Sequence, residues 1–66
     1  MQVQVNGEKM AFDAPLTVGA LLDRLGINPR AVVVEHNLNI VSRDDYDAAR
    51  IQDGDSVEVI RFVGGG

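Results

Sequence analysis

One segment of this sequence has the periodicity of a helix, and it decides how the rest of the chain can pack. Val18, Leu21, Leu22 and Leu25 follow the i, i+3, i+4, i+7 spacing of an amphipathic helix. Thr17 is a good N-cap because its hydroxyl can accept a hydrogen bond from a backbone N–H of the first turn. A helix this short is stable only when its leucine stripe lies on another element, so the chain needs a sheet.

The residues after this stripe predict a defined helix end. Gly26 can supply the left-handed residue of a C-terminal cap, and Ile27 can then contact Leu22, as in a Schellman ending. Asn28-Pro29 prevents the helix from continuing.

Most of the remaining apolar residues form extended patterns. Val3 and Val5 alternate with polar neighbours, and Asn6-Gly7 separates them from a second extended run over residues 8–12. Asn-Gly strongly predicts a hairpin because a type I′ turn requires positive φ at both central residues. The β-branched run over residues 31–35 predicts a central strand covered on much of both faces.

The second half of the chain predicts shorter elements and then one long strand. The expected elements are an exposed turn over His36-Asn37-Leu38-Asn39, a short strand Ile40-Val41, a helical or 3-10 turn over residues 43–46 with a weak Ser42/Asp45 capping box, a turn at Asp53-Gly54-Asp55, and a last strand over residues 56–63. The first and last strands are both β-branched, so we expect them to pair in parallel beneath the helix.

This order favours the α+β class, with a mixed sheet packed on one main helix. A chain of 66 residues holds one small domain of two layers, which excludes a large enclosed active site. We assign residues 1–63 to the folded domain and residues 64–66 to a flexible C-terminal glycine tail. The expected core residues are Val5, Leu21, Leu22, Leu25, Val33 and Val57.

Charge and composition exclude several functions. Six Lys and Arg residues against ten Asp and Glu residues give a net charge of −4, whereas nucleic-acid binding needs clustered cations. With no cysteine and a single histidine, His36, we expect no metal site and no cofactor bound by the domain itself. The arginines Arg43, Arg50 and Arg61 are sparse enough to be surface ion-pair partners.

The apolar segments are too short for a membrane or export role. The first five residues lack the pattern of a signal peptide. The longest apolar run, residues 31–34, is far shorter than the roughly 20 residues that cross a bilayer. We therefore expect a soluble cytoplasmic protein.

The most informative feature for function is Val63-Gly64-Gly65-Gly66, directly after the last strand. These glycines fill no turn, and glycine loses the most conformational freedom when ordered, so a packed role is improbable. Without Cβ atoms such a tail can thread a narrow cleft in another protein, and its terminal carbonyl is open to attack. A frayed chain end is the alternative.

We expect partner proteins to bind at the last strand. Ile60, Phe62 and Val63 lead into the tail, and contiguous exposed apolar residues commonly mark an interface. For Val57 and Val59 we expect a place in the core instead.

The whole chain resembles the ThiS family, the ubiquitin-like β-grasp sulfur carriers of thiamin biosynthesis. The resemblance rests on the order of the N-terminal strand through Asn6-Gly7, Thr17-Val18 with Leu21-Leu22, the strand over residues 31–35, Asn37, Ile40-Val41 with Ser42-Arg43, Asp53-Gly54-Asp55, and the terminal Gly65-Gly66. It implies a protein cosubstrate and not an enzyme.

The resemblance also implies partners for the tail. An E1-like adenylyltransferase would use ATP to convert the Gly66 carboxylate into an acyl-adenylate. Sulfur from a donor such as a cysteine desulfurase would then replace AMP to give a thiocarboxylate, which donates its sulfur on thiazole synthase. Two alternatives stay open: a sibling carrier of molybdopterin synthesis or another sulfur pathway, and a ubiquitin-like module that binds partners without carrying a covalent group.

Overall fold

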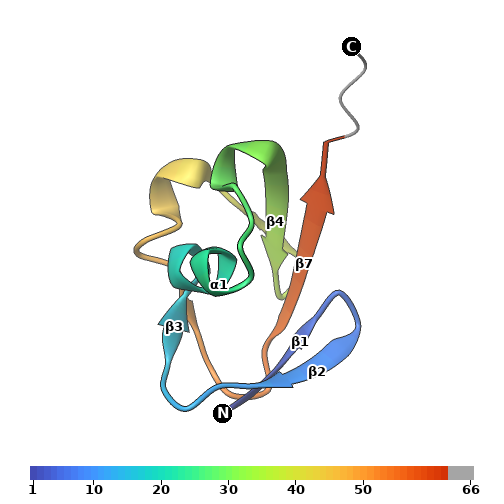
Figure 1. The fold of residues 1–66 in the computed structure, drawn as a ribbon, viewed down its shortest axis with the longest axis vertical. Helices are drawn as coiled ribbons and strands as arrows, with labels where there is room; N and C mark the ends of the chain where they lie inside the picture. The colour runs from blue at the N-terminus through green and yellow to red at the C-terminus, as the bar shows by residue number, and fades with distance from the viewer. Residues whose placement is uncertain (63–66) are drawn as a thin grey trace.

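The computed structural model describes residues 1–62 of the chain, as a sheet with one main helix on one side (Figure 1). The elements in chain order are β1 (Gln2–Val5), β2 (Glu8–Ala11), β3 (Leu16–Thr17), α1 (Val18–Arg24), η1 (Pro29–Ala31), β4 (Val32–His36), β5 (Asn39–Val41), η2 (Arg43–Asp45), β6 (Arg50–Ile51) and β7 (Ser56–Arg61), where η marks a 3-10 helix. Within this described part, no helix has the length and apolarity needed to cross a membrane.

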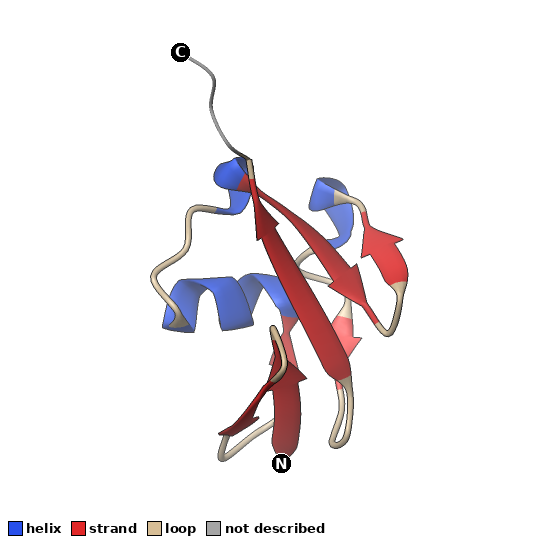
Figure 2. Cartoon of the chain, turned by 90° about the vertical axis from the view of Figure 1, so that its right-hand side faces the viewer, coloured by secondary structure: helices blue, strands red, loops and turns tan. Residues whose placement is uncertain are grey.

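The main sheet has five strands in the order β2-β1-β7-β4-β5. β1 and β7 pair in parallel, as expected, whereas the pairs β1·β2, β4·β5 and β4·β7 are antiparallel. The helix α1 lies against one face of this sheet (Figure 2). β7 is therefore the central strand of the sheet, with β1 and β2 on one side of it and β4 and β5 on the other.

Local turn chemistry confirms the predicted hairpin and helix. Asn6 and Gly7 have φ of 51° and 83°, both positive as a type I′ turn requires. The Thr17 hydroxyl accepts a hydrogen bond from the Ala20 N–H at 3.1 Å. The helix closes with Gly26 at φ 69° and an Ile27 N–H donating to the Leu22 carbonyl at 2.9 Å, which is the predicted Schellman ending.

Four short elements, η1, β3, β6 and η2, differ from the sequence expectations. Asn28 caps the 3-10 turn η1 through its side chain, and this turn was not predicted from the sequence. β3 and β6 form a second, two-stranded sheet that was also missed. The turn η2 was expected, but Ser42 makes no side-chain capping bond there, so the capping box is not formed.

The core between α1 and the sheet contains most of the residues predicted for it. Val5, Leu21, Leu22 and Val57 are buried, and Leu25 packs against them half-buried. Val33 was assigned to this core wrongly: its neighbours Val32 and Val34 are buried, whereas Val33 is only half-buried. Side chains alternate along a strand, and one helix covers only one face of the sheet, so β4 is not covered on both faces.

Candidate functional site at the end of strand β7

The backbone of β7 is fixed up to the last described residues. On the β1 side, where β1 has ended, the Asn6 side chain accepts the Val59 N–H at 2.7 Å. On the β4 side, the Phe62 N–H donates to the Ala31 carbonyl at 3.1 Å, one step beyond the Val32–Arg61 pair. The direction in which the chain leaves the domain is thus set by hydrogen bonds on both edges of the strand.

The last strand divides into a buried and an exposed set, as predicted. Val57 and Val59 belong to the core, whereas the Ile60 side chain is 48% exposed and that of Phe62 is 58% exposed. Val63 and the tail residues Gly64, Gly65 and Gly66 lie outside the described residues. The binding role assigned to Ile60, Phe62 and Val63 stays a prediction, but the exposure it requires of the first two is present.

A hollow of about 380 Å³ adjoins this end of β7. It is lined by Gly26, Ile27, Asn28, Ala31, Val32, Arg61 and Phe62. Arg61 is the one charged residue among these described lining residues, so they bring no pair of acid and base groups together.

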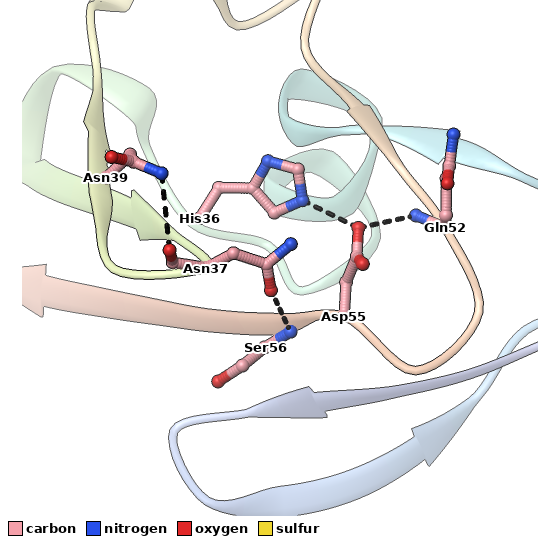
Figure 3. A network of polar contacts seen from close by, with 6 residues as sticks. All are labelled: His36, Asn37, Asn39, Gln52, Asp55 and Ser56. Carbon is pink, nitrogen blue, oxygen red and sulfur yellow. Dashed lines mark hydrogen bonds and ion pairs between the residues drawn. The ribbon is translucent and has the colours of Figure 1, made fainter.

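His36 is not the exposed turn residue that the sequence predicted. It ends β4, its side chain is only 20% exposed, and its Nε2 lies 2.7 Å from Asp55 Oδ2 (Figure 3). Since an ionised carboxylate only accepts hydrogen bonds, Nε2 carries a proton in this contact. The partner lies 19 residues along the chain, and no local pattern could have indicated it.

The same network joins two turns at the start of β7. The Gln52 N–H donates to Asp55 Oδ2 at 2.8 Å, and the Ser56 N–H donates to Asn37 Oδ1 at 2.9 Å (Figure 3). Burial raises the pKa of Asp55, but hydrogen bonds from the Gln52 backbone and the His36 and Asn37 side chains together lower it below its ordinary value. The carboxylate is thus a structural acceptor, at the opposite end of β7 from the candidate site.

Two further features of the described residues are compared with the sequence expectations: metal-ligating groups and the surface ion pairs of three arginines. Residues 1–62 contain no group of three His, Asp or Glu side chains able to hold a metal ion. No Lys or Arg among residues 1–62 forms an ion pair, so the pairs expected of Arg43, Arg50 and Arg61 are not formed there. Arg43 instead donates to the Arg30 carbonyl at 3.3 Å.

Several known proteins have sequences similar to this chain. Thiazole synthases of Paramagnetospirillum magneticum and Magnetococcus marinus are 46% and 42% identical to the whole chain, which spans only about 20% of their length. The sulfur carrier protein ThiS of Bacillus subtilis is 31% identical over 65 residues, which cover 97% of this chain and 98% of that protein.

The fold agrees with a solved structure over its full length. The crystal structure of the thiamine biosynthesis protein ThiS from Geobacter metallireducens is 38% identical, matches 100% of both chains and superposes with a TM-score of 0.88. The arrangement is thus the expected ubiquitin-like β-grasp. The ThiS family model matches residues 3–66, so the chain belongs to the ThiS family.

Proposed function

We propose that this chain is a sulfur carrier of thiamin biosynthesis and that its reactive group is the Gly66 carboxylate. The observation that carries the proposal is the family match through Gly66, together with a Bacillus subtilis relative of equal length that is named a sulfur carrier. The chain acts as a protein cosubstrate and not as an enzyme. It binds no cofactor of its own, and ATP is used by its partner.

The proposed reaction has four steps. The Gly66 carboxylate attacks the α-phosphorus of ATP on an E1-like adenylyltransferase, and pyrophosphate leaves, which turns an unreactive carboxylate into an acyl-adenylate. The terminal sulfur of a persulfide on a donor such as a cysteine desulfurase then attacks the carbonyl carbon, and AMP leaves to give an acyl disulfide. A thiol reductant cleaves the S–S bond of this intermediate and releases the thiocarboxylate. Thiazole synthase takes the sulfur for thiazole formation, and the carboxylate returns.

The exposed end of β7 supports this function physically. Hydrogen bonds to Asn6 and Ala31 hold the strand in place up to Phe62. An enzyme that binds the domain therefore receives the residues after Phe62 from a fixed starting position. A fixed starting position matters because correct positioning of the reacting atoms removes a large part of the activation barrier. Gly64, Gly65 and Gly66 carry no side chains that would hinder entry into a narrow active site.

Similarity to two thiazole synthases favours the thiamin pathway over a sibling sulfur pathway. In each of them a region similar to this chain is part of a polypeptide named for the enzyme proposed to receive the sulfur. We therefore propose thiazole synthase as the second partner.

Intact mass spectrometry tests the proposal directly. After incubation with ATP, the cognate adenylyltransferase and a sulfur source, we expect the mass to rise by one exchange of oxygen for sulfur. Omission of ATP and deletion of Gly66 serve as controls, and both should abolish the gain. An unchanged mass in the complete reaction would favour a non-covalent binding module, and sulfur transfer to molybdopterin synthase alone would favour the sibling pathway.

A further inference from the structure

The positively charged side chains of this protein are almost all arginines, and two of these arginines lie where β7 ends. The sequence contains five arginines and a single lysine, Lys9. Arg61 is the last residue of β7. Arg30 lies close to this strand end, because the next residue, Ala31, accepts the Phe62 N–H through its carbonyl. Both arginines are exposed, so the cations at the base of the tail are arginines and not lysines.

The two primary amines of residues 1–62 lie at the other end of the sheet. Lys9 on β2 is directly opposite Gln4 on β1, and Gln4 is opposite Ser56, the first residue of β7. The amino group of Met1 donates to the Phe12 carbonyl at 2.9 Å, just before β1 begins. Both amines therefore lie near the level at which β7 starts, whereas the tail follows the end of that strand (Figure 2).

The tail is too short to bring Gly66 to the amine of Lys9. Phe62 lies six residues beyond Ser56, which is about 20 Å along a strand that rises about 3.3 Å per residue. Two strand spacings of about 4.8 Å separate β7 from β2, so Lys9 lies roughly 22 Å from Phe62. Residues 63–66 span at most about 14 Å, and a lysine side chain adds about 6 Å. A turn back along the sheet would shorten this reach further.

Lysine and arginine differ in how they react with an activated acyl group. A lysine ammonium can lose a proton to give a nucleophilic amine, whereas an arginine guanidinium stays protonated in proteins. In a self-acylation, the lone pair of a lysine Nζ attacks the carbonyl carbon of the Gly66 acyl-adenylate. The bond from that carbon to the oxygen of AMP breaks, AMP leaves, and Nζ loses a proton to water. The product is an amide that no longer accepts sulfur.

We propose that this distribution of cations protects the activated tail from reaction with its own domain, and that Arg61 holds a positive charge where a lysine would be acylated by Gly66. This inference rests on the proposed function, because only an activated Gly66 needs such protection. Four residues separate position 61 from Gly66, and groups joined by a short flexible segment have an effective concentration in the millimolar range. The residue type at position 61 therefore determines whether the acyl group is kept for sulfur.

Amide formation in a Gly66 α-thioester, made from an intein fusion, tests the proposal without a partner enzyme. The thioester replaces the acyl-adenylate, because both present the same carbonyl carbon with a good leaving group. At about 10 µM protein and about pH 8.5, we expect Arg61→Lys to link residues 61 and 66 about 100-fold faster than two chains link to each other, as the ratio of millimolar to micromolar concentrations predicts. Intact mass distinguishes the amide from the hydrolysed chain by one water, and fragmentation locates the new bond. Arg50→Lys is the matched control, because it introduces the same amine on β6, which pairs with β3 and not with β7, and it should give no intramolecular amide.

Two results would overturn the proposal. One is a similar rate of amide formation in Arg61→Lys and Arg50→Lys, and the other is an intramolecular amide between Gly66 and Lys9 in the wild type. Melting temperatures check that the variants fold, and Phe62→Lys, which places an amine at the adjacent exposed position, should react as Arg61→Lys does. Sulfur gain by the wild type without selective amide formation in these variants would reject the protection alone. Selective amide formation in a protein that gains no sulfur would reject the proposed function alone.

Discussion

At the scale of single residues, Asp55 makes the stability of this domain depend on pH. Its folded pKa lies below the ordinary value, so its contribution to stability is fully present above the unfolded pKa and is lost as the pH falls toward the folded pKa. We expect the free energy of unfolding in urea to fall from about pH 5 to about pH 3 more steeply in the wild type than in Asp55→Asn. Parallel curves for the two proteins would contradict this assignment.

Prediction from single residues succeeded where the residue type determines the local backbone conformation. Asn6, Gly7 and Gly26 adopt positive φ, as their residue types indicate, and Thr17 caps the helix that follows it. It failed for His36, because the fold brings Asp55 to it across 19 residues. Contacts between residues distant in the chain depend on topology, which a local pattern does not contain.

At the scale of elements, β4 shows why a run of β-branched residues is ambiguous. Val32, Val33 and Val34 are equally apolar, so the sequence has no alternation that tells which of them faces the helix. The structure resolves this through the register with β7, where Val34 is opposite the buried Val59 and Val33 is opposite the exposed Ile60. The two-residue strands β3 and β6 were missed for a related reason: they are too short to carry any period.

This difference between adjacent valines has a measurable consequence. We expect Val34→Ala to lower the free energy of unfolding by about 2 kcal/mol, because it leaves a cavity under α1. Val33→Ala removes the same atoms from the half-exposed outer face and should cost less than about 1 kcal/mol. Denaturant titration of the two variants checks this order, and equal losses would show that both faces of β4 are packed.

At the scale of the whole molecule, the sequence predicted the architecture better than the details of the site. The single leucine stripe, the Asn6-Gly7 turn and the β-branched first and last strands sufficed for a mixed sheet on one helix. The exposure of Ile60 and Phe62 was also predicted, from their position next to the tail. The distance of Lys9 from the end of β7 could not be anticipated, because it depends on the order of the strands and on their register.

The last prediction concerns the separation of folding from function along the chain. Among residues 1–62, every buried core residue lies from Val3 to Val59, so we expect changes at Gly65 or Gly66 to barely alter the melting temperature. Deleting Gly66, or adding one bulky residue after it, moves the reacting carbon by about 3.3 to 3.6 Å, and a misplacement of even about 1 Å can lower a rate about 100-fold. We also expect Gly65→Val to lower the rate of adenylation severely, since a β-branched side chain restricts the backbone and fills space that glycine leaves free.

Pyrophosphate release from ATP, measured with the cognate adenylyltransferase, should fall sharply in all three variants while their melting temperatures stay near that of the wild type. A wild-type rate in the extended variant would mean that the Gly66 carboxylate is not the group that reacts.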